Sequence, residues 1–150
     1  MTRPMRMCSA RAVLFLAPVA IWCTEPELPT PVGRWKTIDD KTGKPKAIVQ
    51  IYMENGRLFG KVEATLDPNA KKVCTLCKDE RKNQPIPGMV ILRNLSLHGD
   101  EYRGGDILDP DNGSVYRCKL RLEDHGRRLS VRGFIGFSLL GRSQTWTREP

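Results

Sequence analysis

Apolar and polar residues alternate along most of the chain after residue 31, with a period of two that is typical of strands with one buried face. The clearest example is the segment 101–122, EYRGGDILDPDNGSVYRCKLRL. Turn residues gather at its middle, where Pro110 fixes φ and Gly113 tolerates a positive φ. The segment therefore predicts two strands joined by a tight turn. The apolar positions of its second strand are Tyr116, Cys118, Leu120 and Leu122.

The same alternation recurs on both sides of this hairpin, between short clusters of Gly, Asn, Asp and Pro. We therefore expect an all-β fold of about eight short strands. Consecutive strands with tight turns form an antiparallel meander, and closure into a barrel removes its exposed edges. We predict a single up-and-down barrel of this kind, and a two-sheet sandwich is the alternative. The remaining strands are expected at 32–39, 46–54, 57–66, 89–97, 127–137 and 142–148.

The segment 67–88 breaks the alternation, since it is polar and proline-rich and contains the pair Cys74 and Cys77 at Cys-x-x-Cys spacing. A loop of this length in a small domain is typically functional or disordered. For the pair, we favour a local disulfide formed in an oxidising compartment over a redox motif or a zinc site. Zinc needs four ligands, and the sequence offers no second pair. Cys118 is expected in the core.

The N-terminus has the pattern of a secretory signal peptide, which we place at 1–23. Arg3, Arg6 and Arg11 precede or begin an apolar run at 12–22 that is short for a membrane span. A buried N-terminal helix is the alternative. Cleavage after Ala20 or after Cys23 is open, and the bulky Trp22 disfavours a lipid anchor at Cys23. The protein is then periplasmic or secreted, with no transmembrane segment after cleavage. A Pro-rich linker follows at 24–31, and the domain occupies 32–150.

Length and charge restrict the functional classes. The 150 residues are enough for one domain, and the formal net charge is +8. Without the three N-terminal arginines, 22 basic residues face 17 acidic ones, a net charge of +5. The basic residues are spread along the strands rather than gathered in a patch with stacking aromatics, so we expect no nucleic-acid binding.

Several stretches together resemble a known family. They are GRWKTIDDKTGKPKAIVQIY from residue 33, the Cys-x-x-Cys loop, GGDILDPDNGSVYRCKL from residue 104 and VRGFIGFSLLGRSQTWTR from residue 131. They resemble the uncharacterised bacterial domain-of-unknown-function family twenty-one forty-seven, over 32–148. The resemblance implies an exported lipocalin-like barrel and no established activity. It also implies that an arginine near the last strand, Arg148 or Arg142, packs over Trp35.

Catalytic signatures are weak. His98 and His125 both lie in turns beside glycine, and the sequence has no G-x-S-x-G elbow. We therefore expect no enzyme activity, no cofactor and no metal site. Arg93 and Asp106 could form a polar pair inside the barrel that orients a ligand, but a bulge at Gly104-Gly105 would place both outside, and we favour the latter.

The predicted function is the binding of a small amphipathic or hydrophobic molecule in the interior, which in an eight-stranded barrel holds side chains or one small ligand. The alternative is a ligand-free envelope protein that acts through its surface or through the loop 67–88. The candidate ligand-binding residues are Trp35, Arg93, Tyr102, Asp106 and Tyr116.

Overall fold

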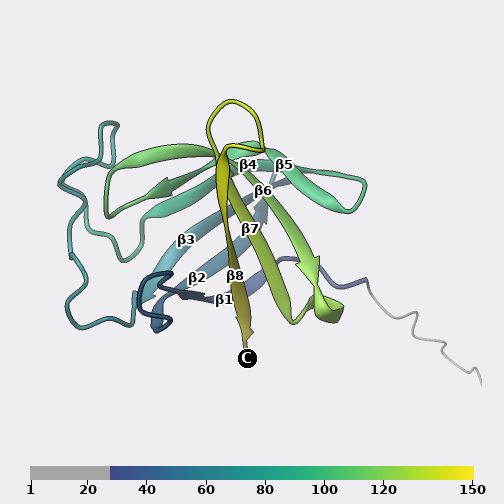
Figure 1. The fold of residues 1–150 in the computed structure, drawn as a ribbon, viewed down its shortest axis with the longest axis horizontal. Coiled ribbons are helices and arrows are strands. Elements are labelled where there is room, and N and C mark those ends of the chain that lie inside the picture. The colour runs from purple at the N-terminus through teal and green to yellow at the C-terminus, as the bar shows by residue number, and fades with distance from the viewer. Residues whose placement is uncertain (1–27) are drawn as a thin grey trace, which may run out of the picture.

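The computed structural model describes residues 28–150, and the predicted signal peptide at 1–23 and the first half of the linker lie outside this part. Eight strands and one short 3-10 turn make up the fold (Figure 1). They are β1 (Gly33–Ile38), β2 (Pro45–Glu54), β3 (Arg57–Thr65), β4 (Val90–His98), β5 (Glu101–Asp109), β6 (Ser114–Glu123), η1 (Asp124–Gly126), β7 (Arg128–Phe134) and β8 (Gly141–Glu149).

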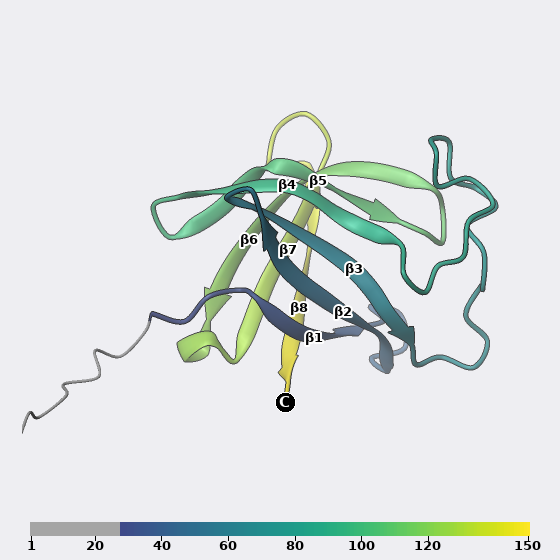
Figure 2. The same cartoon turned by 180° about the vertical axis from the view of Figure 1, so that it is seen from behind.

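The strands form one closed antiparallel barrel in sequence order, β1 to β8. Closure is made by β1 and β8, with Trp35 opposite Arg148. Figures 1 and 2 show the strands wrapped around a common axis, with no second layer. The predicted all-β up-and-down barrel is therefore confirmed, and the sandwich is not formed. No helix among residues 28–150 is long and apolar enough to cross a membrane.

The core follows the alternation seen in the sequence. On β6, Cys118 and Leu120 are buried while Arg121 is exposed, as the pattern predicts for one inward and one outward face. One predicted strand is too long: β7 ends at Phe134, and residues 135–140 form a loop. Ile135 continues the alternation by sequence but is largely exposed. The alternation in the sequence therefore extends beyond the last paired residue.

Two bulges face each other in the middle of the sheet. Three steps along β4, from Leu92 to Leu95, lie opposite two steps along β3, from Gly60 to Leu58, and Asn94 takes a left-handed φ of 62°. On β5, Gly104 has a φ of 85° and is the extra residue against β6, as the paired glycines indicate. Each bulge shifts the inward and outward positions of its strand by one. Residue alternation alone therefore misplaces side chains on one side of each bulge.

One end of the barrel is closed by side chains and by the segment before β1. The indole of Trp35 is fully buried and donates a hydrogen bond to the carbonyl of Pro31. The guanidinium of Arg148 lies 4.3 Å from the Trp35 ring centroid and donates to the carbonyls of Thr30, Val32 and Gly126. Arg148 is thus the arginine that packs over Trp35. We call this the closed end; its turns are 55–56, 99–100 and 124–127.

The connections β1–β2, β3–β4, β5–β6 and β7–β8 lie at the opposite end, which we call the open end. The β3–β4 loop, 66–89, carries a disulfide between Cys74 and Cys77. It packs against the β5–β6 turn: a Cβ at Gly113 would come within 2.0 Å of the Leu76 carbonyl oxygen. Leu108 faces outward from β5 yet is buried, because this loop covers it. The loop therefore forms an outer wall of the open end, as Figure 1 shows.

Candidate ligand-binding cavity

A cavity of about 390 Å³ occupies the half of the barrel nearest the open end. Its walls are mainly apolar and come from all eight strands. The inward residues on β1 and β7 are small here, because Thr37 and Gly133 stand where larger side chains would fill the barrel. The main apolar lining residues are Ala47, Val49, Val62, Ile91, Ile107, Tyr116, Val131 and Trp146.

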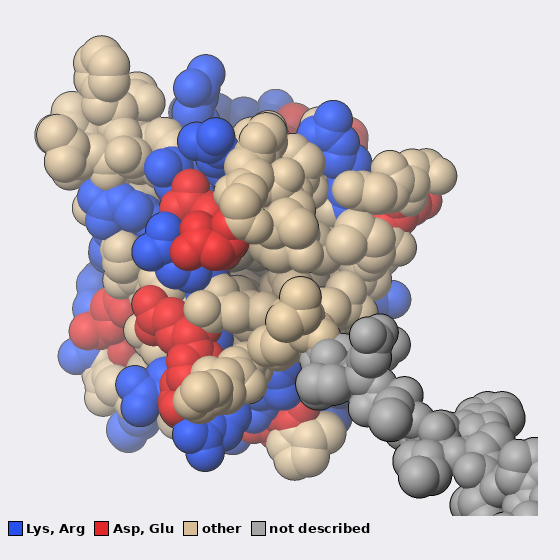
Figure 3. Space-filling view, turned by 90° about the vertical axis from the view of Figure 1, so that its right-hand side faces the viewer, with Lys and Arg blue, Asp and Glu red and all other residues tan. Residues whose placement is uncertain are grey.

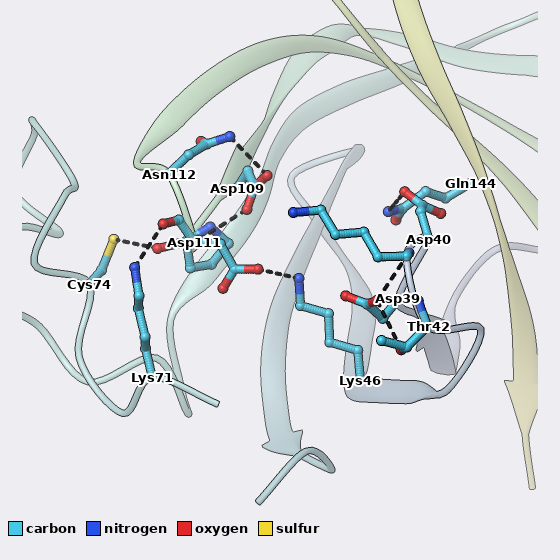
Figure 4. Close-up of polar contacts among 12 residues, drawn as sticks. Asp39, Asp40, Thr42, Lys46, Lys71, Cys74, Asp109, Asp111, Asn112 and Gln144 are labelled. Atoms are coloured by element: carbon cyan, nitrogen blue, oxygen red, sulfur yellow. Dashed lines mark hydrogen bonds and ion pairs between the residues drawn. The ribbon is translucent and has the colours of Figure 1, made fainter. Parts of the chain in front are cut away.

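Polar side chains ring the mouth on the side of the β5–β6 turn (Figure 4). Lys46 forms an ion pair with Asp111, and Lys71 donates to the Asp111 carbonyl at 3.0 Å. The side-chain amide of Asn112 lies between the Asp109 carboxylate and the Tyr116 hydroxyl, at 3.1 and 3.3 Å. These contacts fix the turn and bring charged groups of both signs to the entrance.

A second polar chain runs from the cavity wall to the mouth. Trp146 donates from Nε1 to Gln144 Oε1 at 3.1 Å, and Gln144 donates from Nε2 to Asp40 Oδ2 at 2.8 Å. Arg142 pairs with the same carboxylate at 3.1 Å. The chain links β8 to the β1–β2 loop and leaves the indole of Trp146 with a partner inside an apolar wall.

Of the five candidate ligand-binding residues, the structure brings Tyr116 to the cavity. Trp35 lies at the closed end, where its ring and its N–H group are occupied by Arg148 and Pro31. Tyr102 also lies toward the closed end, opposite Leu120, and packs against the core. The cavity and these two aromatic residues are thus at different levels of the barrel.

Arg93 and Asp106 are cross-strand partners on β4 and β5, but they lie on the outer face. Their neighbours Leu92 and Ile107 form the adjacent pair that faces inward. Arg93 pairs with Glu80 of the β3–β4 loop rather than with Asp106. Burial raises the pKa of Asp106, Arg93 opposes this shift, and one of the carboxylate oxygens is buried without a hydrogen-bond partner. The favoured outer placement therefore describes this pair.

The residues that the sequence interpretation missed are the polar ones at the mouth and on the walls. Gln144 and Thr37 occupy inward positions by alternation, and a polar residue at such a position is a signal for a cavity or a network. Lys46 and Asp111 carry no such signal, because their contact joins segments 65 residues apart in the chain. Only the closed barrel brings them together.

The other reactive side chains lie away from the cavity. His98 contacts Ser96 in the β4–β5 hairpin, and His125 lies in the η1 turn. Cys118 is buried in the core, and burial raises the pKa of its thiol, which makes it a poor nucleophile. Among residues 28–150 no three His, Cys, Asp or Glu residues are arranged to hold a metal ion. On the face drawn in Figure 3, basic and acidic side chains are interspersed.

Comparisons with known proteins agree with this fold. A model of the family described as "Uncharacterized protein conserved in bacteria (DUF2147)" matches residues 33–148. Among solved structures, protein HP1028 of Helicobacter pylori, described as belonging to the lipocalin family, matches with a TM-score of 0.71 at 20% sequence identity. The match covers 81% of this chain and 84% of HP1028, and it shows a shared lipocalin-like fold. No curated protein sequence matches the chain.

Proposed function

The chain belongs to the DUF2147 family of uncharacterized bacterial proteins, and we propose that it is an exported carrier of a small hydrophobic or amphipathic molecule. The observation that carries the proposal is the cavity of about 390 Å³, which has mainly apolar walls and charged groups at its mouth. This is the usual construction of a small-molecule site. An apolar part of the ligand would lie against Val49, Ile107 and Val131, and a polar part would face the mouth.

The size of the cavity limits the ligand. Small-molecule pockets typically span roughly 300–1,000 Å³, so this one is at the lower end. A single short acyl chain or a compact ring system fits that range, whereas a lipid with two full acyl chains does not. Lys46 and Asp111 at the mouth already neutralise each other in an ion pair. The remaining polar groups of the rim are few, so they can orient a single head group of the ligand.

Export is supported by the N-terminal pattern of three arginines and an apolar run in 1–23. The disulfide between Cys74 and Cys77 agrees with it, because such bonds persist in oxidising compartments. A carrier outside the cytoplasm would move poorly soluble molecules through water. The alternative, an envelope protein that acts through its surface or through the loop 67–88, needs no ligand in the cavity.

The test is to place a larger side chain on the cavity wall, where it occupies the space proposed for the ligand. Ala47 on β2 lines the cavity between Thr37 and Thr65, and Ala64 on β3 lies beside Ile48 on the outer face. Ala47→Phe places a ring in the cavity, whereas Ala64→Phe adds the same ring outside. With the fluorescent probe 1-anilinonaphthalene-8-sulfonate, we expect Ala47→Phe to weaken binding by about tenfold or more, because overpacking excludes the probe. Ala64→Phe should bind like the wild type.

A second variant shows whether weaker probe binding comes from the filled cavity or from a folding defect. Gly133→Val adds volume from β7, where a Cβ would make ordinary contacts of 3.5 Å with Tyr116. It should weaken probe binding while keeping a cooperative thermal transition. Equal probe affinity in the wild type, Ala47→Phe and Gly133→Val would contradict the carrier proposal and favour the surface-acting alternative.

A further inference from the structure

The β7–β8 loop presents an unusual apolar surface. Its sequence from residue 135 to 140 is IGFSLL, without a charged residue. Ile135, Phe137, Leu139 and Leu140 are 66%, 81%, 89% and 71% exposed. Figures 1 and 2 both show the loop projecting beyond the end of the barrel. Single exposed apolar residues are ordinary, but four large ones on one projecting loop indicate a contact surface.

Part of the backbone of this loop is paired within the protein. The amide of Leu140 donates to the Phe137 carbonyl at 3.0 Å, and the amide of Ile135 donates to the Leu140 carbonyl at 3.2 Å. The carbonyl of Ser138 accepts from the guanidinium of Arg132 on β7. Unpaired backbone groups are the main obstacle to moving a loop into an apolar medium. Here the internal bonds lower that cost.

The surroundings of the loop combine the cavity mouth with basic side chains. Ile135 and Leu140 line the mouth. Two arginines stand at the base of the loop: Arg132 on β7 binds the Ser138 carbonyl, and Arg142 on β8 follows Leu140 by two residues and pairs with Asp40. An apolar tip with basic side chains at its base has the composition of a segment that lies in the interface of an anionic membrane.

We propose that the loop 135–140 docks the barrel onto a lipid bilayer, with its four apolar side chains in the interfacial region. A second copy of the chain is a poorer occupant, because a stable dimer needs about 800 Å² from each partner and a narrow projecting loop offers little flat area. Acyl chains surround a projecting loop on all sides. They therefore cover exposed residues that are adjacent in the chain, such as Leu139 and Leu140.

Docking would turn the cavity mouth toward the bilayer. A poorly soluble molecule could then pass between the membrane and the cavity along Ile135 and Leu140 without crossing bulk water. This consequence rests on the carrier function proposed above, whereas the docking itself rests on the loop. The two are tested separately, since probe binding in buffer reports on the cavity alone.

The experiment places a tryptophan in the loop of the full chain and measures its contact with lipid. In Phe137→Trp, vesicles of phosphatidylcholine and phosphatidylglycerol should shift the emission to the blue, and brominated acyl chains should quench it. Leu97→Trp is the matched control, because Leu97 is 57% exposed in the β4 segment at the closed end. Trp35 and Trp146 are buried and give a constant background, and Trp22 is replaced by Phe in every variant.

Adding Leu139→Ser, which does not line the cavity, to Phe137→Trp should weaken partitioning into the vesicles by about tenfold or more, as expected for the loss of one apolar side chain. Vesicles without phosphatidylglycerol should bind less, because Arg132 and Arg142 at the base of the loop attract the anionic lipid. Absence of quenching at position 137, or equal quenching at position 97, would overturn the proposal. So would a blue shift of Trp at 137 that needs no vesicles and rises with protein concentration, since that indicates self-association. Unchanged probe binding by the serine variant in buffer would leave the carrier function intact.

Discussion

The two ends of the barrel are built from the same strands, but the interior is filled with side chains at one end and hollow at the other. At the closed end, β1 presents Trp35, which fills the interior and is capped by Arg148. Two residues later on the same face, β1 presents Thr37, and the interior opens into the cavity. Likewise β7 presents buried Leu129 toward the closed end and Gly133 toward the open end. Side-chain size along each strand therefore decides where a barrel is solid and where it is hollow.

The contacts that hold the two ends also differ in kind. The closed end depends on a buried ring, a cation above it and hydrogen bonds to backbone carbonyls, none of which needs a titrating partner. The open end depends on carboxylates that pair with lysine or arginine, including Asp111, Asp40 and Asp79. We therefore expect substitutions to affect global stability mostly at the closed end. Acid should affect the open end first.

The largest expected effect compares two arginines of β8. Arg148→Ala removes the cation above Trp35 and three hydrogen bonds to carbonyls, so we expect a loss of about 2–4 kcal/mol in the free energy of unfolding. Arg142→Ala removes an exposed ion pair with Asp40 and should cost less than about 1 kcal/mol. Urea denaturation measures both values, provided the slope of the transition is unchanged. Equal losses in the free energy of unfolding for the two variants would contradict the proposed difference in stability between the two ends.

Most of the fold was predictable because it depends on local patterns. Alternation located the strands, and the turn residues around Pro110 and Gly113 located the turn between β5 and β6. Because tight turns join consecutive strands, closure into a barrel was expected to remove the exposed strand edges, and the family resemblance agreed with this expectation. The disulfide between Cys74 and Cys77, which was favoured over a redox motif and a zinc site, is present. Each of these inferences uses residues that are near one another in the chain.

The cavity was much less predictable, because it depends on bulges and on contacts between distant segments. Asn94 gives no sequence signal for a left-handed bulge, yet it decides that Arg93 points outward. The contact of Gln144 with Asp40 spans 104 residues. The alternation of apolar residues continues as far as Ile135, so it could not show that strand pairing ends at Phe134. Candidate residues chosen for their chemistry alone therefore included two, Trp35 and Tyr102, that lie toward the closed end.

The next effect concerns the outer wall of the open end. Arg81 is almost completely buried, and its guanidinium binds the Asp79 carboxylate and the Val90 carbonyl, which ties the β3–β4 loop to β4. Asp79→Asn would leave this buried cation with a weaker partner, at a cost of about 1–3 kcal/mol. Glu80→Gln, which removes the exposed pair with Arg93, should have a clearly smaller effect.

The pH dependence of this pair gives a second measurement. Arg81 lowers the pKa of Asp79 to about 2, so its stabilising contribution is complete above the ordinary carboxyl value and is lost as the pH falls through about 2. Amide hydrogen exchange in the loop 66–89 should therefore accelerate with acid, after correction for intrinsic rates, before the closed end changes. If the amides of β1 and the loop lost protection together, the two ends would not be separable.

The smallest effect has the opposite sign. Burial raises the pKa of Asp106, and one carboxylate oxygen has no hydrogen-bond partner, so the charged form is disfavoured in the folded protein. An acid with a raised pKa contributes most at low pH, and stability decreases as the pH rises through the folded pKa. Asp106→Asn should therefore raise the free energy of unfolding by less than about 1 kcal/mol at neutral pH, discounted for its partial exposure.

This gain should fade as the pH falls below the ordinary carboxyl value, where the wild-type side chain is neutral as well. Urea denaturation of the wild type and Asp106→Asn at neutral and acid pH measures the difference. A variant that is less stable than the wild type at neutral pH would mean that attraction to Arg93 outweighs burial. Asp106 would then belong with Asp79 among the ion pairs that hold the loop to the barrel, and acid would weaken both contacts in the same direction.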